Sequence, residues 1–415
     1  MIGLVDRNNF FVSCERVFDP RLKGRAVAVL SNNDGCCVSR SNEFKALGIP
    51  MGTPHFKLLD REERGEVVFR SSNFELYGNL SNRIMSILRE ESVDIEQYSI
   101  DEAFIHPPSR AANDWEGYGR ALRTKILKWV GIPCGIGFAP TKTLAKIADH
   151  IAKKTPSGVY VLPADPYSIL DPLPVEEVWN VGRRLAVQLR GAGISTAGDL
   201  ARAQEDVLRE IGGVGLARTA AELRGIETGE RRDYDSNPES VSFSRTFGTP
   251  ITTREALVES IFDYLSRGAE KLRRHTLLAT GCQIYAQLCS ACEHHFVDQV
   301  VLFPRPTDAT NVMLKTVRPF AERLFTPYTR YRKSGIVFFG LEKADGLRQG
   351  DLFEAEETNP AASRLYKIID SLNAKFGHGT IRTAAEAPRR ADWRMKRTNI
   401  SLRATTRWNE LVSVN

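Results

Sequence analysis

Two adjacent carboxylates lie inside an otherwise apolar run, and they restrict the possible folds more than any other feature of the chain. Asp101 and Glu102 stand between Tyr98-Ser99-Ile100 and Ala103-Phe104. The pattern on both sides predicts a β-hairpin with the two acids at its tight turn. A buried carboxylate pair needs a metal ion or basic side chains to neutralise it, although such a pair is also typical of a solvated turn. Other parts of the sequence are needed to distinguish a metal-binding or ion-paired site from a solvated turn.

A third carboxylate ends another short strand. Residues 1–5 are apolar, and Asp6 follows them directly. Three carboxylates at strand ends can bind two hard divalent cations, which prefer oxygen ligands. Two ions about 3.5–4 Å apart recur in phosphoryl transfer, where they stabilise both the attacking and the leaving oxygen. Asp6, Asp101 and Glu102 are therefore candidate ligands of a two-metal site.

Length and charge point to a chain of several domains that stays in the cytoplasm. With 415 residues the chain is too long for one ordinary core, so several domains are expected. The sequence has no run of eighteen apolar residues and no signal-peptide pattern, so no membrane partner is expected. Lys and Arg (57) outnumber Asp and Glu (51), a net charge of +6. Most of the excess lies in residues 382–415, which have eight basic and three acidic residues. This basic tail either binds phosphates or keeps the protein soluble.

The seven cysteines are expected to be free thiols, as is usual in the cytoplasm. Cys289 and Cys292, followed by His294 and His295, superficially resemble a metal-binding loop. A zinc site needs four converging ligands, and two adjacent histidines give a poor spacing, so zinc is not expected here.

Residues 1–165 are expected to form an α+β sheet with helices on one face, which leaves the other face open for a long substrate. Asn8 or Asn9 is the expected N-cap of the first helix, whose N–H groups suit phosphate oxygens. Residues 26–71 are predicted to be a small inserted subdomain. Strands are predicted at 1–5, 26–30, 94–105 (the hairpin) and 133–138, and helices near 10–15, 40–47, 73–91, 112–130 and 141–153.

Two glycine-rich hairpins follow a proline-containing boundary near residue 173. Gly182, Arg183 and Arg184 belong to the first hairpin, and Gly213 and Gly215 to the second. This helix-hairpin-helix pattern lets backbone N–H groups bond DNA phosphates without reading the base sequence. After a charged linker, residues 241–345 follow the order β-α-β-β-α-β of an independent domain. A helix near 362–376 and the basic tail complete the chain.

In combination, these stretches resemble the Y-family of translesion DNA polymerases, and within it the UmuC-like group. The resemblance extends over essentially the whole chain. The stretches on which it rests are Asp6–Glu15, Leu30–Cys36, Tyr98–Phe104, Thr141–Lys146, Val178–Arg184 and Trp393–Arg397. It implies error-prone, template-directed translesion synthesis in the SOS response, binding to damaged DNA, and no proofreading.

The resemblance also implies a right-hand, multidomain α+β fold. The implied parts are a palm (1–25 and 72–165), fingers (26–71), a helix-hairpin-helix thumb (166–232), a linker (233–240), a β-α-β-β-α-β little finger (241–345) and a C-terminal tail (346–415).

Site residues follow from the same resemblance. Two Mg²⁺ ions are expected on Asp6, Asp101, Glu102 and the carbonyl of Arg7. Phe11 is the expected steric gate against ribonucleotides, the alternative being an ordinary core phenylalanine.

Triphosphate contacts are expected from the backbone of Phe10 and Phe11, from Lys45 and from Lys153. Many relatives have tyrosine in place of Asn42 and arginine in place of Lys45, so the role of the fingers in triphosphate binding stays open. The residues expected to bind DNA are Gly182, Arg183, Arg184, Gly213, Gly215 and Arg245.

The implied partners are template-primer DNA, deoxynucleoside triphosphates, a processed UmuD-type dimer, a RecA filament and the β sliding clamp. Gln349, Asp351, Leu352 and Phe353 resemble the clamp-binding motif, although the two apolar residues could instead fold back onto the little finger. Two other classes stay open: a nucleotidyl cyclase, which has no need of hairpins or a little finger, and an inactive DNA-binding scaffold, which has no need of three acids.

Overall fold

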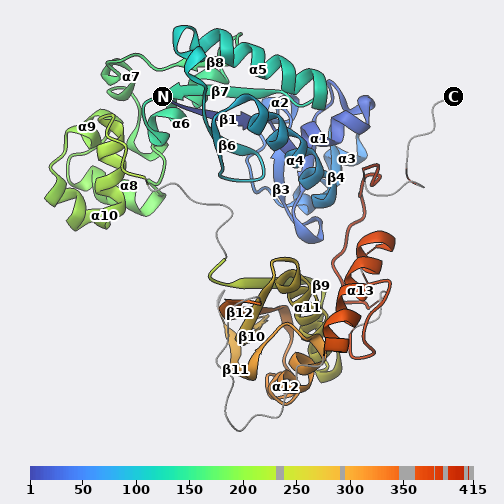
Figure 1. Ribbon diagram of the computed structural model, residues 1–415. Coiled ribbons are helices and arrows are strands. Elements are labelled where there is room, and N and C mark those ends of the chain that lie inside the picture. Colours follow the sequence, from blue (N-terminus) through green and yellow to red (C-terminus); the bar gives the residue numbers. More distant parts are fainter. Residues whose placement is uncertain are drawn as a thin grey trace. The chain divides into compact units, whose positions relative to one another are not determined.

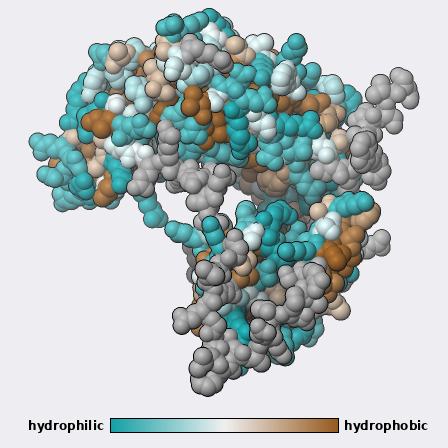
Figure 2. All heavy atoms as spheres, viewed as in Figure 1, coloured by the Kyte–Doolittle hydropathy of each residue, from teal (hydrophilic) through white to brown (hydrophobic). Residues whose placement is uncertain are grey.

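The computed structural model of the protein describes residues 1–229, 238–289, 295–344, 360–377, 379–386, 391–405 and 410. The chain forms two compact units (Figure 1). The first contains residues 1–234 and 398–415, and the second contains residues 235–397. Among the described helices, none is both long and apolar enough to span a bilayer. On the face shown in Figure 2, apolar residues are scattered among hydrophilic ones.

A five-stranded sheet is the centre of the first unit, and it confirms the predicted hairpin. Strand β1 lies between β6 and β7 and is antiparallel to both, while β7 and β8 are parallel. The turn between β5 and β6 contains Tyr98 to Asp101. The strands, in sheet order, are β5 (Asp94–Gln97), β6 (Glu102–His106), β1 (Ile2–Arg7), β7 (Cys134–Ala139) and β8 (Val159–Val161).

Helices cover both faces of this sheet, so the expectation of helices on one face only is wrong. The helices α1 (Phe10–Phe18), α4 (Phe74–Glu91) and α5 (Trp115–Val130) bury one face, whereas α6 (Lys142–Ala152) packs on the other, beside Leu4 and Phe104. Thr141 caps α6, as predicted.

Gly137 explains how α6 can lie directly on β7. A Cβ atom at this position would lie 2.1 Å from the backbone nitrogen of Asp149 and 2.6 Å from the carbonyl oxygen of Ala145. Only glycine therefore permits so close an approach between strand and helix.

Residues 26–71, the expected fingers, contain a small sheet with its own core. Leu30, Phe44 and Phe69 are fully or almost fully buried in it. Its strands, in sheet order, are β3 (Cys37–Arg40), β2 (Val27–Leu30) and β4 (Val68–Ser71), with helices α2 (Asn42–Ala46) and α3 (Leu59–Glu63). The 3₁₀ turns of the first unit are Pro20–Leu22, Asn32–Asp34, His55–Lys57, Ser109–Asn113 and Val175–Glu177.

Four helices form the region expected to be the thumb, and a glycine interrupts the last of them. A single 3₁₀ turn, rather than a helix, precedes Gly182, which is the N-cap of α8. Gly213 breaks α10 with a φ of +69°, a conformation that favours glycine. The helices are α7 (Tyr167–Leu170), α8 (Arg183–Gly191), α9 (Ala197–Arg202) and α10 (Glu205–Leu223).

The end of α10 is fixed to the start of α6 in the palm. The buried carboxylate of Glu222 accepts hydrogen bonds from the backbone N–H and the hydroxyl of Thr143, at 2.9 and 2.5 Å. The hydroxyl of Thr141 donates to the carbonyl of Glu222 at 2.8 Å.

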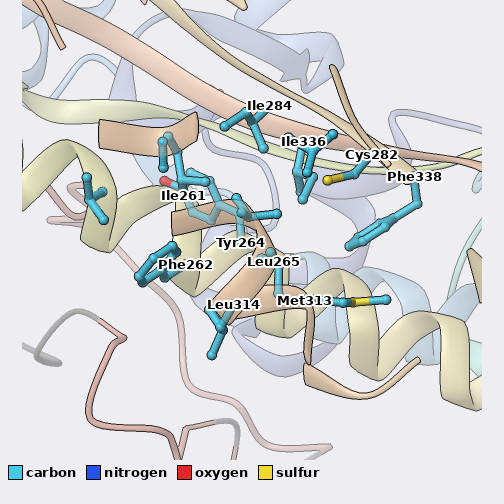
Figure 3. Close-up of a cluster of buried hydrophobic side chains, with 14 of the residues drawn as sticks. Ile261, Phe262, Tyr264, Leu265, Cys282, Ile284, Met313, Leu314, Ile336 and Phe338 are labelled. Carbon is cyan, nitrogen blue, oxygen red and sulfur yellow. The ribbon is translucent and has the colours of Figure 1, made fainter. Parts of the chain in front are cut away.

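The second unit confirms the predicted β-α-β-β-α-β order. Its sheet packs against two helices around a single core that includes Ile261, Ile284 and Phe338 (Figure 3). Trp393 from the C-terminal region joins this core. The elements are β9 (Val241–Ile251), α11 (Arg254–Arg274), β10 (Leu277–Leu288), β11 (Phe296–Thr307), α12 (Thr310–Arg323) and β12 (Tyr331–Lys343), in sheet order β11-β10-β12-β9, followed by α13 (Pro360–Phe376).

Candidate active site

The sheet brings two of the three expected acids face to face. Asp6 and Glu102 are direct partners in the β1–β6 pairing. Since side chains alternate along a strand, both carboxylates share the face of Leu4 and Phe104, where α6 packs. Asp101 comes just before Glu102, and its carbonyl accepts a 3.0 Å hydrogen bond from the N–H of Arg7. Asp6 and Glu102 therefore face each other at this end of the sheet, and the backbone of Asp101 pairs with the next residue of β1.

Ser99 fixes the turn on which Asp101 lies. Its hydroxyl donates to the Asp101 carboxylate at 2.5 Å and accepts from the N–H groups of Asp101 and Glu102 at 3.1 and 3.0 Å. A short polar side chain that bonds nearby backbone groups is a common way to hold a tight turn.

Helix α6 and the residue just after it place two lysines against the acids. The ammonium group of Lys146 lies 2.9 and 3.0 Å from the two oxygens of Glu102. Lys153 lies 2.6 Å from Asp6 and 2.8 Å from Asp149. Residues three, four and seven apart share one face of a helix, which explains why Lys146, Asp149 and Lys153 reach the same sheet edge.

Positive charge does not fully compensate these acids. Burial raises the pKa of Asp6 to about 7, with Lys153 opposing the rise and the carboxylates of Asp149 and Glu102 adding to it. Burial also raises the pKa of Asp149. A divalent cation would relieve this repulsion, and an all-oxygen donor set suits a hard cation such as Mg²⁺. Within the described residues, however, no three acidic, imidazole or thiol groups converge closely enough to hold an ion as they stand.

Arg7 lies on the opposite face of the sheet from Asp6 and Glu102. Its side chain is buried, its guanidinium contacts the sulfur of Met85 at 3.4 Å, and two of its nitrogens have no hydrogen-bond partner. Burial lowers the pKa of Arg7 to about 10, although Cys134, Asp101 and Asp6 act in the other direction. The sequence predicted only its carbonyl as a ligand, so this buried cation behind the acids is an additional feature.

A cleft of about 290 Å³ lies beside Asp6 and Glu102. Asp6, Glu102, Lys146, Lys153 and Trp179 are among the residues that line it. The Trp179 ring contacts Phe104 and Tyr98, and the Lys146 ammonium lies 5.2 Å from its centroid. The cleft thus joins charged groups to a firmly packed aromatic wall.

Phe11 is packed on aromatic rings beside the start of α1. It stacks on Tyr77 at 4.5 Å with an interplanar angle of 13°, and it meets Phe74 edge-on at 5.8 Å. Phe11 is half-buried, whereas Phe10 is buried. One face of the Phe11 ring is therefore covered by Tyr77.

Asn9 and Lys45 link the palm to the fingers. Asn9 occupies the N-cap position with a φ of 48°, but its side chain does not cap the helix. The Asn9 amide instead donates to Asn42 at 3.0 Å, and its oxygen accepts from Lys45 at 2.6 Å. The predicted capping bond is thus replaced by a bridge to α2.

Arg40 belongs to this basic group and was not among the expected residues. Burial lowers the pKa of Lys45, and the nearby cations Arg40 and Lys153 lower it further. Arg40 donates to the carbonyl of Ile49 and retains a buried nitrogen without a partner. Arg40 is the last residue of β3, and its charge acts on Lys45. The residues next to Arg40 in the sequence do not indicate this position.

The thumb glycines have space around them. A Cβ atom at Gly182, Gly213 or Gly215 would meet no heavy atom within 4 Å. Internal packing therefore does not demand glycine there, in contrast to Gly137. Arg183 and Arg184 at the start of α8 are exposed.

Arg245, on β9 of the second unit, lies among other cations. Burial lowers the pKa of Arg245, and the like charges of Arg267 and Arg397 lower it further. The guanidinium groups of Arg245 and Arg267 lie 4.9 and 5.4 Å from the ring centroid of Phe243. Arg397 brings the basic C-terminal region into the same cluster.

Two sequence expectations cannot be compared with the structure. Gln349, Asp351, Leu352 and Phe353 lie outside the described residues, as do Cys292 and His294.

Comparison with known proteins gives the family. The sequence matches the impB/mucB/samB family over residues 5–150 and the C-terminal domain of that family over residues 238–352. It is 36% identical over 423 residues to Protein UmuC of Salmonella typhimurium, with 100% of both chains covered. The chain belongs to the impB/mucB/samB family. It is a UmuC-like member of the Y-family of DNA polymerases, so the resemblance is confirmed.

Other relatives agree with this assignment. Protein SamB of Salmonella typhimurium is 35% identical, with 99% of both chains covered, and DNA polymerase IV 1 of Bacillus subtilis is 29% identical, with 92% of both covered. A solved Y-family polymerase chimera of Dbh and Dpo4 has a TM-score of 0.66 at 22% identity, with 83% of this chain and all of that chain covered. An insertion ternary complex of Dbh DNA polymerase has a TM-score of 0.57 at 22% identity, with 82% and 98% covered. These structures confirm the expected fold class. Separately, residues 363–414 match a domain of unknown function (DUF4113).

Proposed function

We propose that this UmuC-like polymerase extends DNA primers across damaged templates, in an error-prone manner and without proofreading, as part of the SOS response. The observation that carries the proposal is the pairing of Asp6 with Glu102 beside Asp101, under two lysines, in a Y-family chain. The acids could bind the cations, and the lysines and the nearby arginine could bind a triphosphate.

Two Mg²⁺ ions are the proposed cofactors. Asp6, Asp101, Glu102 and the Arg7 carbonyl would bind them, and when bound they supply a lowered pKa for the primer 3′-hydroxyl and a charge partner for the leaving pyrophosphate. The chain's own contribution is positioning. Ser99 holds Asp101, and the β1–β6 register holds Asp6 against Glu102.

The triphosphate would bind to the basic group between palm and fingers. Lys45 and Lys153 are the expected contacts, together with the backbone of Phe10 and Phe11, and Arg40 adds a third cation. Phe11 would exclude the 2′-hydroxyl of a ribonucleotide by steric overlap, because the stacked Tyr77 prevents the ring from moving away.

The proposed DNA contacts lie in the thumb and the little finger. Open space around Gly182, Gly213 and Gly215 allows a phosphate to approach their backbone N–H groups, with Arg183 and Arg184 adding charge. The Arg245 cluster would contribute further backbone contacts. Membership of the UmuC-like group supports a UmuD-type dimer, a RecA filament and the sliding clamp as partners, and a cytoplasmic location.

A primer-extension assay tests this proposal. A labelled primer on a damaged template is incubated with deoxynucleoside triphosphates and Mg²⁺, and duplex binding is measured on the same preparation. Asp101→Asn retains the shape but removes a charge, so incorporation should fall about 10²–10³-fold while DNA binding is retained. Asp94→Asn, on an exposed residue at the far end of the same hairpin, is the matched control and should remain active.

The products also separate the other classes. Primer-independent conversion of nucleotides to cyclic products would indicate a cyclase, and DNA binding without any incorporation would indicate a scaffold. Normal extension by Asp101→Asn would remove the carboxylates from the mechanism.

A further inference from the structure

Residues 398–403, named here the C-terminal strap, return to the first unit and pair with the fingers. The backbone N–H and hydroxyl of Thr398 donate to Asp34 at 2.8 and 2.9 Å. The N–H of Ser71 donates to the carbonyl of Asn399 at 2.9 Å, and the N–H of Asn399 donates to the Ser71 hydroxyl at 3.0 Å. Ile400 forms a parallel bridge with Ser71. The strap thus binds at the end of β4.

The same strap also binds the palm. The Ser401 hydroxyl donates to the carboxylate of Glu15 at 3.1 Å and accepts from the amide of Asn73 at 3.0 Å. Asn73 is the N-cap of α4, with its side-chain oxygen accepting from the N–H of Leu76. Residues 71–73 lead from the fingers into the palm, so the strap holds both ends of this crossing.

Glu15 connects the strap to the aromatic stack under the proposed sugar site. Its carboxylate is buried and accepts the Ser401 hydroxyl and the Tyr77 hydroxyl on the same oxygen, the latter at 2.7 Å. Burial raises the pKa of Glu15, and the two hydroxyl donors oppose the rise. Tyr77 is fully buried and carries the Phe11 ring on its face. The contacts therefore run without a gap from Ser401 through Glu15 and Tyr77 to Phe11.

We propose that the C-terminal strap is a positioning element that sets sugar discrimination. By holding Glu15 and Asn73, the strap fixes the Tyr77 ring on which Phe11 rests, and it joins the fingers to the palm at the same point. This inference rests on the proposed polymerase function and on Phe11 as the gate. It also gives a role to part of the region that matches a domain of unknown function.

The first experiment uses the full-length chain and one hydroxyl group. For Ser401→Ala, the ratio of kcat/KM for a deoxynucleotide to that for the matching ribonucleotide should fall about tenfold, the change that losing one hydrogen bond to a charged group produces. Ser401→Thr keeps the hydroxyl and should restore the ratio. Leu402→Ala, on an exposed strap residue, is the matched control and should leave the ratio unchanged.

A double-mutant cycle distinguishes positioning of the gate from general loosening of the site. Phe11→Ala alone should lower the sugar preference, and Ser401→Ala should have no further effect in that background. A chain that ends at Arg397 should show the Ser401→Ala defect, and a peptide of residues 398–415 added in trans should reverse it. The point variant remains informative if the shortened chain does not fold.

The outcomes separate this inference from the proposed function. A wild-type chain that incorporates no nucleotide overturns the proposed function and this inference with it. If the wild type incorporates nucleotides and Phe11→Ala changes the sugar preference, an unchanged ratio in Ser401→Ala overturns the strap alone. Additive effects of Ser401→Ala and Phe11→Ala would also overturn it.

Discussion

Replacement of Gly137 by alanine tests whether the contact between α6 and β7 positions the site. The added Cβ would lie 2.1 Å from the nitrogen of Asp149, which is 1.3 Å short of the 3.4 Å at which ordinary contact begins. The obstacle is helix backbone, so α6 itself has to move. Overpacking of this kind costs about 1–3 kcal/mol of stability. A displacement of about 1 Å of Lys146 and Lys153 should reduce incorporation about 10²-fold.

The assay pairs denaturant unfolding with single-nucleotide incorporation. Gly78→Ala is the control because a Cβ there would meet nothing within 4 Å inside α4. That variant should be more stable by about 0.5–1 kcal/mol and fully active, since alanine is the better helix residue. If Gly137→Ala retains wild-type stability and rate, α6 does not rest on β7 in the way described.

Three further predictions concern single sites. Lys153→Ala should raise the KM for a deoxynucleotide about tenfold or more, because a charged contact to the triphosphate is lost; an unaltered KM would place the triphosphate elsewhere. Replacing Leu352 and Phe353 by alanine should abolish stimulation by the sliding clamp on a long circular template and leave short-primer extension intact, whereas a loss of thermal stability would assign both residues to the fold. Because the pKa of Glu15 is raised above its ordinary value of 4.5, the folded state binds this proton more tightly than the unfolded state. The free energy of unfolding should therefore fall as pH rises from 4.5 through the pKa of the folded state. Denaturant unfolding at about pH 5 and about pH 8 should therefore show a smaller decrease for Glu15→Gln than for wild type, and equal decreases would contradict the burial of this carboxylate.

Local patterns predicted much of the fold. The β5–β6 hairpin and the amphipathic helix α4 each depend on the pattern within one short segment, and the structure confirms both. The β-α-β-β-α-β order of the second unit follows from a succession of such segments and is also confirmed. The sequence named Asp6 and Glu102 as candidate ligands of one site, and the β1–β6 register places them opposite each other, although it did not predict that pairing. The residues Gln349 to Phe353 remain a prediction from the sequence.

Contacts between distant segments could not be predicted in this way. The position of α6 on the acid-bearing face depends on Gly137, and two glycines in an apolar strand were the available signal for a close approach. Arg40 joins the site only through the folding of the fingers. The strap is a short polar sequence without periodicity, so nothing local indicates that Ser401 meets Glu15, 386 positions away.

The lysines at α6 give the site its most specific electrostatic property. Lys153 and Lys146 form ion pairs with carboxylate oxygens that a hard cation prefers, so a bare cation has to compete with two ion pairs. A triphosphate changes this competition, because its oxygens accept the displaced ammonium groups while the cation takes the carboxylates. Cation and nucleotide should therefore bind more tightly together than separately. In Lys153→Ala this coupling should weaken. Calorimetric titration should show tighter binding of Mn²⁺ alone and weaker binding of the nucleotide. Equal losses of affinity for Mn²⁺ and for the nucleotide would mean that the lysine only supports the fold.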